Sequence, residues 1–267
     1  PPGTEKTRPE IYGMGFRNPF RIGLDPKTGH IMLGEYGPDA GTASSTRGPQ
    51  NTVEWNIISE PGNYGWPYCI GNNTPYIDYN FATQQSGAPF NCAAPVNDSP
   101  NNDGLTELPP MVPATVWYHY AADPQNFPEL RGGAPMGGPV YRDDPDLQSD
   151  VKWPAYWDGK AIFGEWNNDQ LWSFQLDESG TELVEMNRIL GSLSFKKPMD
   201  MKFGPDGALY MIEWGSGFGG DNADSGIYRI DYIKGTRPPI ARATADKTDG
   251  PLPLAVTFSS EGSRDPE

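Results

Sequence analysis

A short pattern that recurs along the chain constrains the fold more than any other feature. The segment 18–37, NPFRIGLDPKTGHIMLGEYG, aligns with 197–215, KPMDMKFGPDGALYMIEWG. Each contains Pro before an alternating apolar strand, a Gly-containing turn, and a second apolar strand. Each then closes on Glu, an aromatic residue and Gly. A recurring strand–turn–strand unit predicts a fold built from repeated small β-sheets.

The repeat also indicates how these sheets are arranged. A third copy, 157–180, has the Gly turn, the apolar strand and a Glu-Trp ending, and 226–232 is a further short alternating strand. The Glu-aromatic pairs begin at Glu35, Glu165 and Glu213, and the last two are 48 residues apart. This spacing is close to one four-stranded propeller blade. We therefore predict an all-β fold in which residues 1–235 form about three to four blades of a probable six-bladed propeller.

Composition agrees with a turn-rich β protein and excludes some partners. The chain has 32 Gly and 29 Pro, yet also 8 Trp, 13 Tyr and 11 Phe, which is not the composition of a disordered chain. A net charge of −15 argues against nucleic acid, and no apolar run is long enough to span a membrane. The opening, PPGTEKTRPE, resembles the interior of a longer protein, so we expect missing blades of the same protein to precede it.

Two cysteines, Cys69 and Cys92, flank a stretch rich in Asn, Gly, Pro and Ser. They lie within 59–113, a region almost without periodicity, as expected of a functional or covalently anchored loop. An isolated pair in such a region favours a disulfide and hence a secreted, extracellular or periplasmic protein. Two unrelated free thiols are the alternative.

The last segment, 236–267, does not continue the pattern of the repeats. Pro239, Ala241, the turn at Gly250-Pro251-Leu252, the strand AVTFSSEGS and Asp265-Pro266 resemble the opening of a PKD domain, an immunoglobulin-like β-sandwich. We expect a linker and the first strands of such a domain here.

Arg17 and Asn18, directly before Pro19, are by themselves ordinary turn and surface residues. Together with later motifs, however, they resemble the glucose/sorbosone dehydrogenase family, whose members are secreted propellers that oxidise sugars with pyrroloquinoline quinone (PQQ) and calcium. The matching residues are Gly15, Arg17-Asn18-Pro19, Glu35-x-Gly37-Pro38, Glu54 with Asn56, and Gly62-Asn63-Tyr64-Gly65-Trp66-Pro67.

The resemblance implies roles for particular residues. Arg17, Asn18 and Lys197 match cofactor contacts, and a guanidinium suits the carboxylates of PQQ. The carbonyls of Gly37 and Pro38 match ligands of a catalytic calcium. Glu54 and Tyr64 match a structural calcium region, with Asn72 or Asp78 as possible further ligands. For Glu54, an exposed acid at a strand end is the alternative reading.

Other positions depart from the family pattern. Met199 and Asn167 stand where well-known members have Arg and Lys, so the expected pocket is less cationic. The resemblance implies that the catalytic base is a His from an earlier blade, upstream of residue 1. Neither His30, in a hairpin turn expected to be exposed, nor His119, in an aromatic strand, matches that base. No catalytic residue is therefore assigned to this chain.

Trp214 and Asp221 lie in the Gly- and Asp-rich stretch WGSGFGGDNADSG, which we interpret as a long hairpin loop. The alternative is that Trp214 and Asp221 contact the substrate. The sequence hypothesis is an exported PQQ- and calcium-dependent enzyme that oxidises a hydroxyl of a sugar or polysaccharide-derived substrate by hydride transfer. A non-catalytic carbohydrate-binding propeller is the alternative, and a structural module with the PKD segment as spacer is a third.

Overall fold

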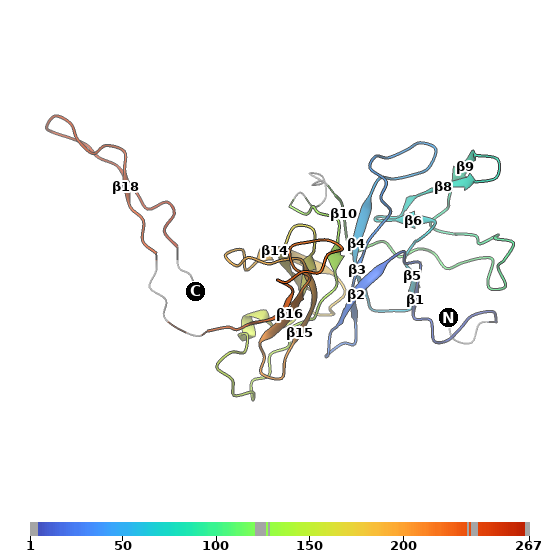
Figure 1. Ribbon diagram of the computed structural model, residues 1–267, viewed down its shortest axis with the longest axis horizontal. Helices are drawn as coiled ribbons and strands as arrows, with labels where there is room; N and C mark the ends of the chain where they lie inside the picture. The colour runs from blue at the N-terminus through green and yellow to red at the C-terminus, as the bar shows by residue number, and fades with distance from the viewer. Residues whose placement is uncertain (1–4, 121–126, 128, 234, 236–239, 265–267) are drawn as a thin grey trace. The chain divides into compact units, whose positions relative to one another are not determined.

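The computed structural model describes residues 5–120, 127, 129–233, 235 and 240–264. Its regular structure is almost entirely β-strand (Figure 1), which confirms the all-β prediction. Within these residues the one helix is a three-residue 3₁₀ turn, Ala155–Trp157, so no helix there could cross a membrane. The chain divides into two compact units, Pro1–Asp231 and Tyr232–Glu267.

Three antiparallel sheets dominate the first unit, and we call them blades 1, 2 and 3. Blade 1 contains β2 (Pro19–Leu24), β3 (Ile31–Glu35), β4 (Thr52–Ile58) and β10 (Val116–His119). Blade 2 contains β11 (Pro135–Met136), β12 (Lys160–Glu165), β13 (Gln170–Leu176) and β14 (Leu183–Ile189). Blade 3 contains β15 (Pro198–Phe203), β16 (Leu209–Glu213) and β17 (Gly226–Ile230).

The first strands of the three blades, β2, β11 and β15, contact one another, and each sheet extends away from this meeting point. This is the arrangement of propeller blades around an axis. The number of blades lies within the predicted range, and the recurring strand pairs of the sequence are the first two strands of blades 1 and 3.

Apolar side chains fill the spaces between blades. Trp55 of β4 packs against Phe163 and Phe174 of blade 2, and all three are fully buried. A second cluster, which includes Trp153, Met201 and Leu209, lies between blades 2 and 3. The middle strands β4 and β12 are buried along their whole length, so they read as continuous apolar runs interrupted by a few buried polar residues.

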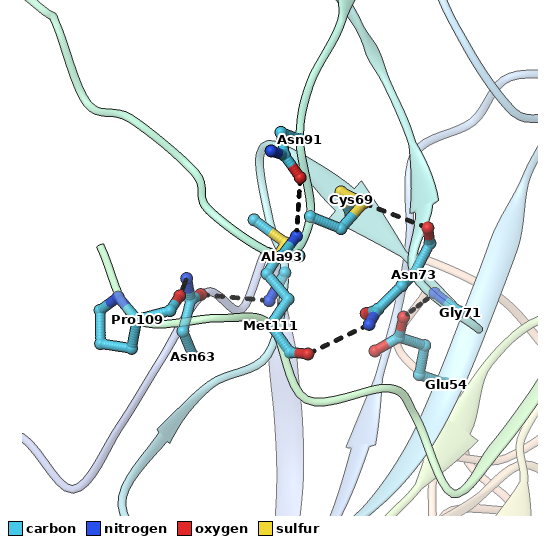
Figure 2. Close-up of a disulfide and its surroundings, with 11 residues drawn as sticks. Glu54, Asn63, Cys69, Gly71, Asn73, Asn91, Ala93, Pro109 and Met111 are labelled. Atoms are coloured by element: carbon cyan, nitrogen blue, oxygen red, sulfur yellow. Dashed lines mark hydrogen bonds between the residues drawn. A yellow bond between two sulfur atoms is a disulfide. The ribbon is translucent and has the colours of Figure 1, made fainter. Parts of the chain in front are cut away.

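The long aperiodic region 59–113 is organised by very short strand pairs rather than by one open loop. These strands are β5 (Gly62–Asn63), β6 (Cys69–Ile70), β7 (Thr74–Pro75), β8 (Ile77–Asn80) and β9 (Gln85–Pro89), and β5 pairs in parallel with β1 (Gly13–Met14). A disulfide joins Cys69 to Cys92, and Asn73 nearby donates to the Met111 carbonyl over 3.1 Å (Figure 2).

The second unit contains one short ladder, β18 (Thr244–Ala245) with β19 (Phe258–Ser259), and a bridge between Ile240 and Arg264. Pro239, Asp265 and Pro266, on which part of the PKD resemblance rests, lie outside the described residues. The PKD-like sandwich remains a prediction.

Candidate functional site

A cavity of about 700 Å³ opens where the three first strands meet. Its walls come from all three blades, and they combine aromatic rings, apolar side chains, two amides and one carboxylate. The lining residues are Asn18, Phe20, Tyr36, Asp39, Ala134, Pro135, Met136, Trp166, Asn167, Met199, Trp214 and Phe218. We call this the axial cavity.

The Glu-aromatic repeat found in the sequence builds this cavity. Its three aromatic residues, Tyr36, Trp166 and Trp214, follow the second strands of blades 1, 2 and 3, and all three line the cavity. The Trp166 ring lies 6.5 Å from the Trp214 ring and 5.9 Å from the Phe218 ring, measured between centroids, in edge-on arrangements. The repeat therefore places one aromatic wall residue per blade.

The three glutamates of the repeat are buried, and none of them lines the cavity. Each pairs in register with the Pro that begins the first strand of its own blade, giving the pairs Pro19–Glu35, Pro135–Glu165 and Pro198–Glu213. We call each pair a Pro–Glu clasp. Proline has no N–H to offer its partner strand, and in each clasp the carboxylate accepts a backbone N–H from residues just before the Pro.

In blade 1 these donors are Arg17 and Asn18, and in blade 2 they are Gly133 and Ala134. In blade 3 the Lys196 N–H bonds to Glu213. The clasps thus hold the backbone of the residues that lead into the cavity wall.

The residue after each clasp Pro lines the cavity in every blade: Phe20, Met136 and Met199. The strand register shifts at Phe20 in β2 and at Met199 in β15. A β-bulge changes the direction of the extra residue's side chain. The bulges therefore explain how Phe20 and Met199, near the starts of their strands, come to line the cavity. Met199 is 6% exposed, so it contributes apolar surface where the resemblance implies an Arg.

Arg17 lies at the rim of the axial cavity, where it is exposed. Its Nη1 donates to the Gly37 carbonyl over 3.1 Å and to the Tyr36 carbonyl over 3.3 Å, and its guanidinium lies 5.9 Å from the centroids of the Tyr36 and Trp66 rings. The hydrogen bonds of this cation therefore go to carbonyls and not to a carboxylate. Asn18, also exposed, contributes directly to the lining.

The contact to Gly37 bears on the predicted catalytic calcium. A guanidinium and a calcium ion are both cations, so they cannot share the Gly37 carbonyl without strong repulsion. The described residues also contain no cluster of three or more His, Cys, Asp or Glu side chains able to hold a metal. As arranged, the Gly37–Pro38 turn does not fit calcium, and the ion would require Arg17 to move.

Lys197 lies just behind the wall of blade 2. Its Nζ is 4.9 Å from the Trp166 ring centroid, donates to the Asn167 carbonyl over 3.1 Å, and is 3.4 Å from the Asp169 carboxylate. Asn167 lines the cavity, and its backbone N–H donates to Glu165 over 3.1 Å. The lining itself contains no Lys or Arg among the described residues, and the two cations stand next to it on different blades.

Asp39 is the carboxylate of the lining. The hydroxyls of Tyr36 and Tyr120 donate to its Oδ1 over 2.5 and 2.8 Å. These hydrogen bonds, that from Tyr36 first, lower the pKa of Asp39 below its ordinary range. Asp39 is therefore ionised at neutral pH, a weak base but a good acceptor for a ligand hydroxyl.

The structure separates Glu54 from Tyr64. Glu54 is 2% exposed and accepts hydrogen bonds from the Gly71 N–H and the Asn56 amide, so it is not an exposed strand-end acid (Figure 2 shows the Gly71 contact). Tyr64 stacks on Phe16 at 4.9 Å and donates to the Glu60 carbonyl over 3.3 Å.

Glu54 faces Glu35 across the β3–β4 ladder. Burial raises the pKa of both carboxyls, and for Glu35 the charge of Glu54 raises it further. Asn72 and Asp78, the possible further ligands, are exposed. The structure therefore gathers no calcium ligand set around Glu54 and Tyr64 from the residues it describes.

The remaining candidates lie in or near the cavity or well away from it. Trp214 lines the axial cavity and also an adjoining hollow that contains Asp221 and Arg21, so Asp221 lies next to the cavity rather than in it. His30 is partly buried, with Nδ1 3.1 Å from the Gly180 carbonyl, which corrects the expectation of an exposed turn residue. His119 lines a separate hollow. Neither His reaches the axial cavity.

Sequence reasoning missed Tyr36, Trp166 and Asp39 as wall residues, and missed the glutamates as supports. The Glu-aromatic repeat was the available signal for all but Asp39. It was used to count blades, although its recurrence at one end of each second strand could also have predicted a shared surface.

Comparison with known proteins points in the same direction as the motifs. The family described as Glucose / Sorbosone dehydrogenase matches residues 2–98. An uncharacterized protein of Synechocystis, slr1608, is 24% identical over 208 residues, which cover 78% of this chain and 37% of that protein. The HIPL1 protein of Arabidopsis thaliana is 21% identical over 251 residues, covering 91% of this chain and 30% of its own length. The chain thus spans about a third of these relatives.

Among solved structures, a glucose dehydrogenase is 21% identical with a TM-score of 0.49, over 86% of this chain and 49% of that one. The PQQ-bound aldose sugar dehydrogenase of Streptomyces coelicolor is 16% identical with a TM-score of 0.46, over 86% of this chain and 48% of that one. These likenesses are weak, and the blade arrangement described above rests on the strand pairing of the chain itself.

Proposed function

We propose that this chain forms part of a sugar-oxidising propeller of the glucose/sorbosone dehydrogenase type, and that its axial cavity holds the redox cofactor and the sugar. The observation that carries the proposal is the cavity itself. It lies where three blades meet, its aromatic walls are supplied by one repeated motif, and Arg17 and Asn18 stand at its rim. The family match over residues 2–98 supports the same activity.

The residues of the cavity fit a planar quinone such as PQQ in shape and partly in charge. Trp166, Trp214 and Tyr36 offer flat faces for stacking. Among the described residues no carboxylate accepts a hydrogen bond from the Arg17 guanidinium, so a carboxylate of the cofactor could accept from it. Lys197 lies next to Trp166 and could pair with a second carboxylate if it left Asp169. When bound, the quinone would accept the hydride from the sugar carbon.

The chain's own residues would bind and orient the reactants. The amides of Asn18 and Asn167 each offer a donor and an acceptor to quinone oxygens or sugar hydroxyls. The ionised Asp39 would accept a hydrogen bond from a sugar hydroxyl, but its lowered pKa makes it a poor acceptor of the proton that leaves this hydroxyl. We therefore assign no catalytic base to this chain. Secretion and the PKD module remain part of the proposal as the sequence suggests them, whereas calcium does not, because the Arg17 guanidinium occupies the Gly37 carbonyl.

The test is PQQ binding by the full-length protein, with and without calcium, followed by dye reduction with a panel of aldoses. Arg17→Ala should weaken PQQ binding by at least about tenfold, since a charge-assisted hydrogen bond contributes about 1.5–3 kcal/mol. Arg47→Ala is the matched control, because Arg47 stacks on Tyr79, 3.9 Å from its centroid, and does not line the cavity. Equal PQQ affinity of the two variants would contradict the role of Arg17.

A second candidate function, binding of a neutral sugar without oxidation, is favoured by one observation. The lining contains a carboxylate and no cation, whereas PQQ carries three carboxylates. Protein that binds aldoses in the absence of PQQ, does not bind PQQ, and loses aldose binding in Trp214→Ala would have this function.

A further inference from the structure

A second hollow, of about 710 Å³, lies on the outer side of blade 1 and shares no lining residue with the axial cavity. It is formed where three distant segments meet: the loop 43–52, the β6–β7 region at 71–77, and the outermost strand, β10. Its volume falls within the range of about 300–1,000 Å³ that is typical of small-molecule sites.

Two residues of β10 contribute to the lining of this hollow. Trp117 and His119 alternate with the buried Val116 and Tyr118, so both side chains lie on the outer face of blade 1 and are half-buried. Gly71, at φ 64°, lies against the Trp117 ring, and a Cβ there would come within 3.2 Å of it. The backbone of the insertion therefore packs against the indole directly.

The hydrogen bonds of His119 fix which ring nitrogen carries the proton. The Thr52 hydroxyl donates to the Gln50 carbonyl over 2.9 Å, and the same oxygen lies 3.1 Å from His119 Nδ1. A hydroxyl has one proton, and a carbonyl can only accept. Both contacts are satisfied only if Nδ1 carries the proton and donates to Thr52, which leaves Nε2 of the neutral imidazole as an acceptor.

Other polar groups of the hollow are also unpaired. Among the described residues, no hydrogen-bond partner is seen for the Trp117 indole N–H, the Gln50 side-chain amide, or the hydroxyls of Ser45 and Thr74. No Asp, Glu, Lys or Arg occurs among the described residues that line it, although the protein carries a net charge of −15. A charged ligand would lose its solvation here and gain no opposite charge.

We propose that this outer hollow is a second binding site and that its ligand is a neutral oligosaccharide. The Trp117 indole packs against Gly71 and, edge-on, against Phe127, and the part that lines the hollow offers an apolar surface for the C–H face of a sugar ring. His119 Nε2, the Gln50 amide and the free hydroxyls can accept from and donate to the ring hydroxyls. The site does not depend on the proposed redox function, and it would hold a polysaccharide chain against the protein while the axial cavity acts independently.

The experiment is calorimetric titration of the whole chain with cellohexaose, maltohexaose and xylohexaose, and with a charged hexagalacturonate for comparison. At least one neutral hexasaccharide should bind with a Kd of about 1 mM or lower, which corresponds to about −4 kcal/mol. Trp117→Ala should weaken binding at least tenfold. His119→Phe, which keeps a flat ring and removes the acceptor, should weaken it severalfold.

Two controls make the result specific. Tyr156→Ala removes an exposed aromatic ring, 69% accessible, on the 3₁₀ turn, and should bind as the wild type does. Trp214→Ala alters the axial cavity and should keep the part of the binding that Trp117→Ala removes. If Trp117→Ala fails to fold, Ser45→Trp tests the same site by filling it from an exposed loop. The proposal is wrong if no neutral hexasaccharide binds, if only the hexagalacturonate binds, or if Trp214→Ala abolishes binding while Trp117→Ala and Ser45→Trp do not.

Discussion

The residue before the clasp Glu occupies the same position in each blade, yet its surroundings differ from blade to blade. In blade 1 it is Gly34, and a Cβ there would lie 2.3 Å from the Pro135 carbonyl of blade 2. In blade 2 it is Gly164, where a Cβ would lie 3.3 Å from the Pro198 side chain of blade 3. In blade 3 it is Ile212, which is 46% exposed.

Blades 1 and 2 therefore meet backbone to backbone, whereas blades 2 and 3 meet through side chains. Gly23 repeats the pattern at the first junction, since its Cβ would lie 1.9 Å from the Gly138 carbonyl. Side chains can rearrange to relieve a close contact, but a carbonyl fixed in a sheet cannot. The comparison shows that one repeated sequence motif can produce a rigid junction and a more tolerant one.

The largest expected effect comes from Gly34→Ala. Its methyl group would overlap a backbone carbonyl, so we expect a loss of at least about 3 kcal/mol of unfolding free energy. Gly164→Ala, the matched control at the equivalent position of blade 2, should cost about 1 kcal/mol or less. Urea unfolding measures both. Equal losses would contradict the distinction between the junctions.

The outer end of the first junction depends on an ion pair. Arg142, in the β11–β12 connection of blade 2, donates through Nε to Asp25 of blade 1 over 2.8 Å, and the Asp25 side chain is fully buried. Burial would raise the pKa of Asp25, but the hydrogen bonds from Arg142, Lys27 and Thr28 lower it to about 2. Arg142→Ala should therefore cost about 3 kcal/mol at neutral pH, because it leaves a buried charge unpaired.

This ion pair also predicts how the stability of the protein changes with pH. Because the folded pKa lies below the ordinary 3.8, the pair stabilises fully above about pH 4, and its contribution is lost as the pH falls through 2. Stability measured from pH 5 to pH 2 should fall less steeply in Asp25→Asn than in the wild type. A parallel pH profile would show that Asp25 is not the group responsible.

The clasp of blade 2 should produce the opposite dependence. Burial raises the pKa of Glu165 from 4.5 to about 7, despite hydrogen bonds from Tyr118, Ala134 and Asn167. A raised carboxyl pKa contributes stability at low pH that is lost as the pH rises through 7. Glu165→Gln, which keeps an acceptor, should reduce the decline between pH 4.5 and 8 by about 3 kcal/mol. Glu185→Gln, exposed on β14, serves as the control.

The smallest effect is expected at the third equivalent position. Ile212→Ser replaces an exposed side chain on the face of blade 3, and should change the unfolding free energy of this chain by less than about 0.5 kcal/mol. A loss of more than about 1 kcal/mol would show that this face is packed in solution, and would remove the contrast with Gly34 and Gly164.

Much of the blade architecture could be predicted, because paired strands with Gly turns leave a clear alternation in the sequence. The first strand of blade 2, β11, was missed for a physical reason. It is two residues long and lies in GGAPMGGPVY, where glycines allow blades 1 and 2 to approach and leave no periodicity to read.

The residue types expected at the site could be read from the sequence. The contacts that their side chains make in the folded protein could not. Asn18 and Trp214 line the axial cavity and Arg17 donates to the carbonyl of Tyr36, another lining residue, while the roles of all three toward a cofactor or substrate stay predictions. The Arg17 side chain donates to the Gly37 carbonyl, and Glu54 is buried and accepts from the Gly71 N–H. Both contacts result from tertiary packing, and no local sequence pattern predicts them.

In the Pro–Glu clasps, one set of groups fixes the backbone and another supplies the side chains of the cavity wall. The clasp fixes the course of the main chain through a proline ring, a buried acid and backbone amides, and of these residues only Asn18, Ala134 and Pro135 also line the cavity among those described. The next side chain, Phe20, Met136 or Met199, is therefore free to vary in sequence without loss of the local backbone path. Such a wall can be reshaped for a new ligand one blade at a time, by single substitutions that leave the scaffold in place.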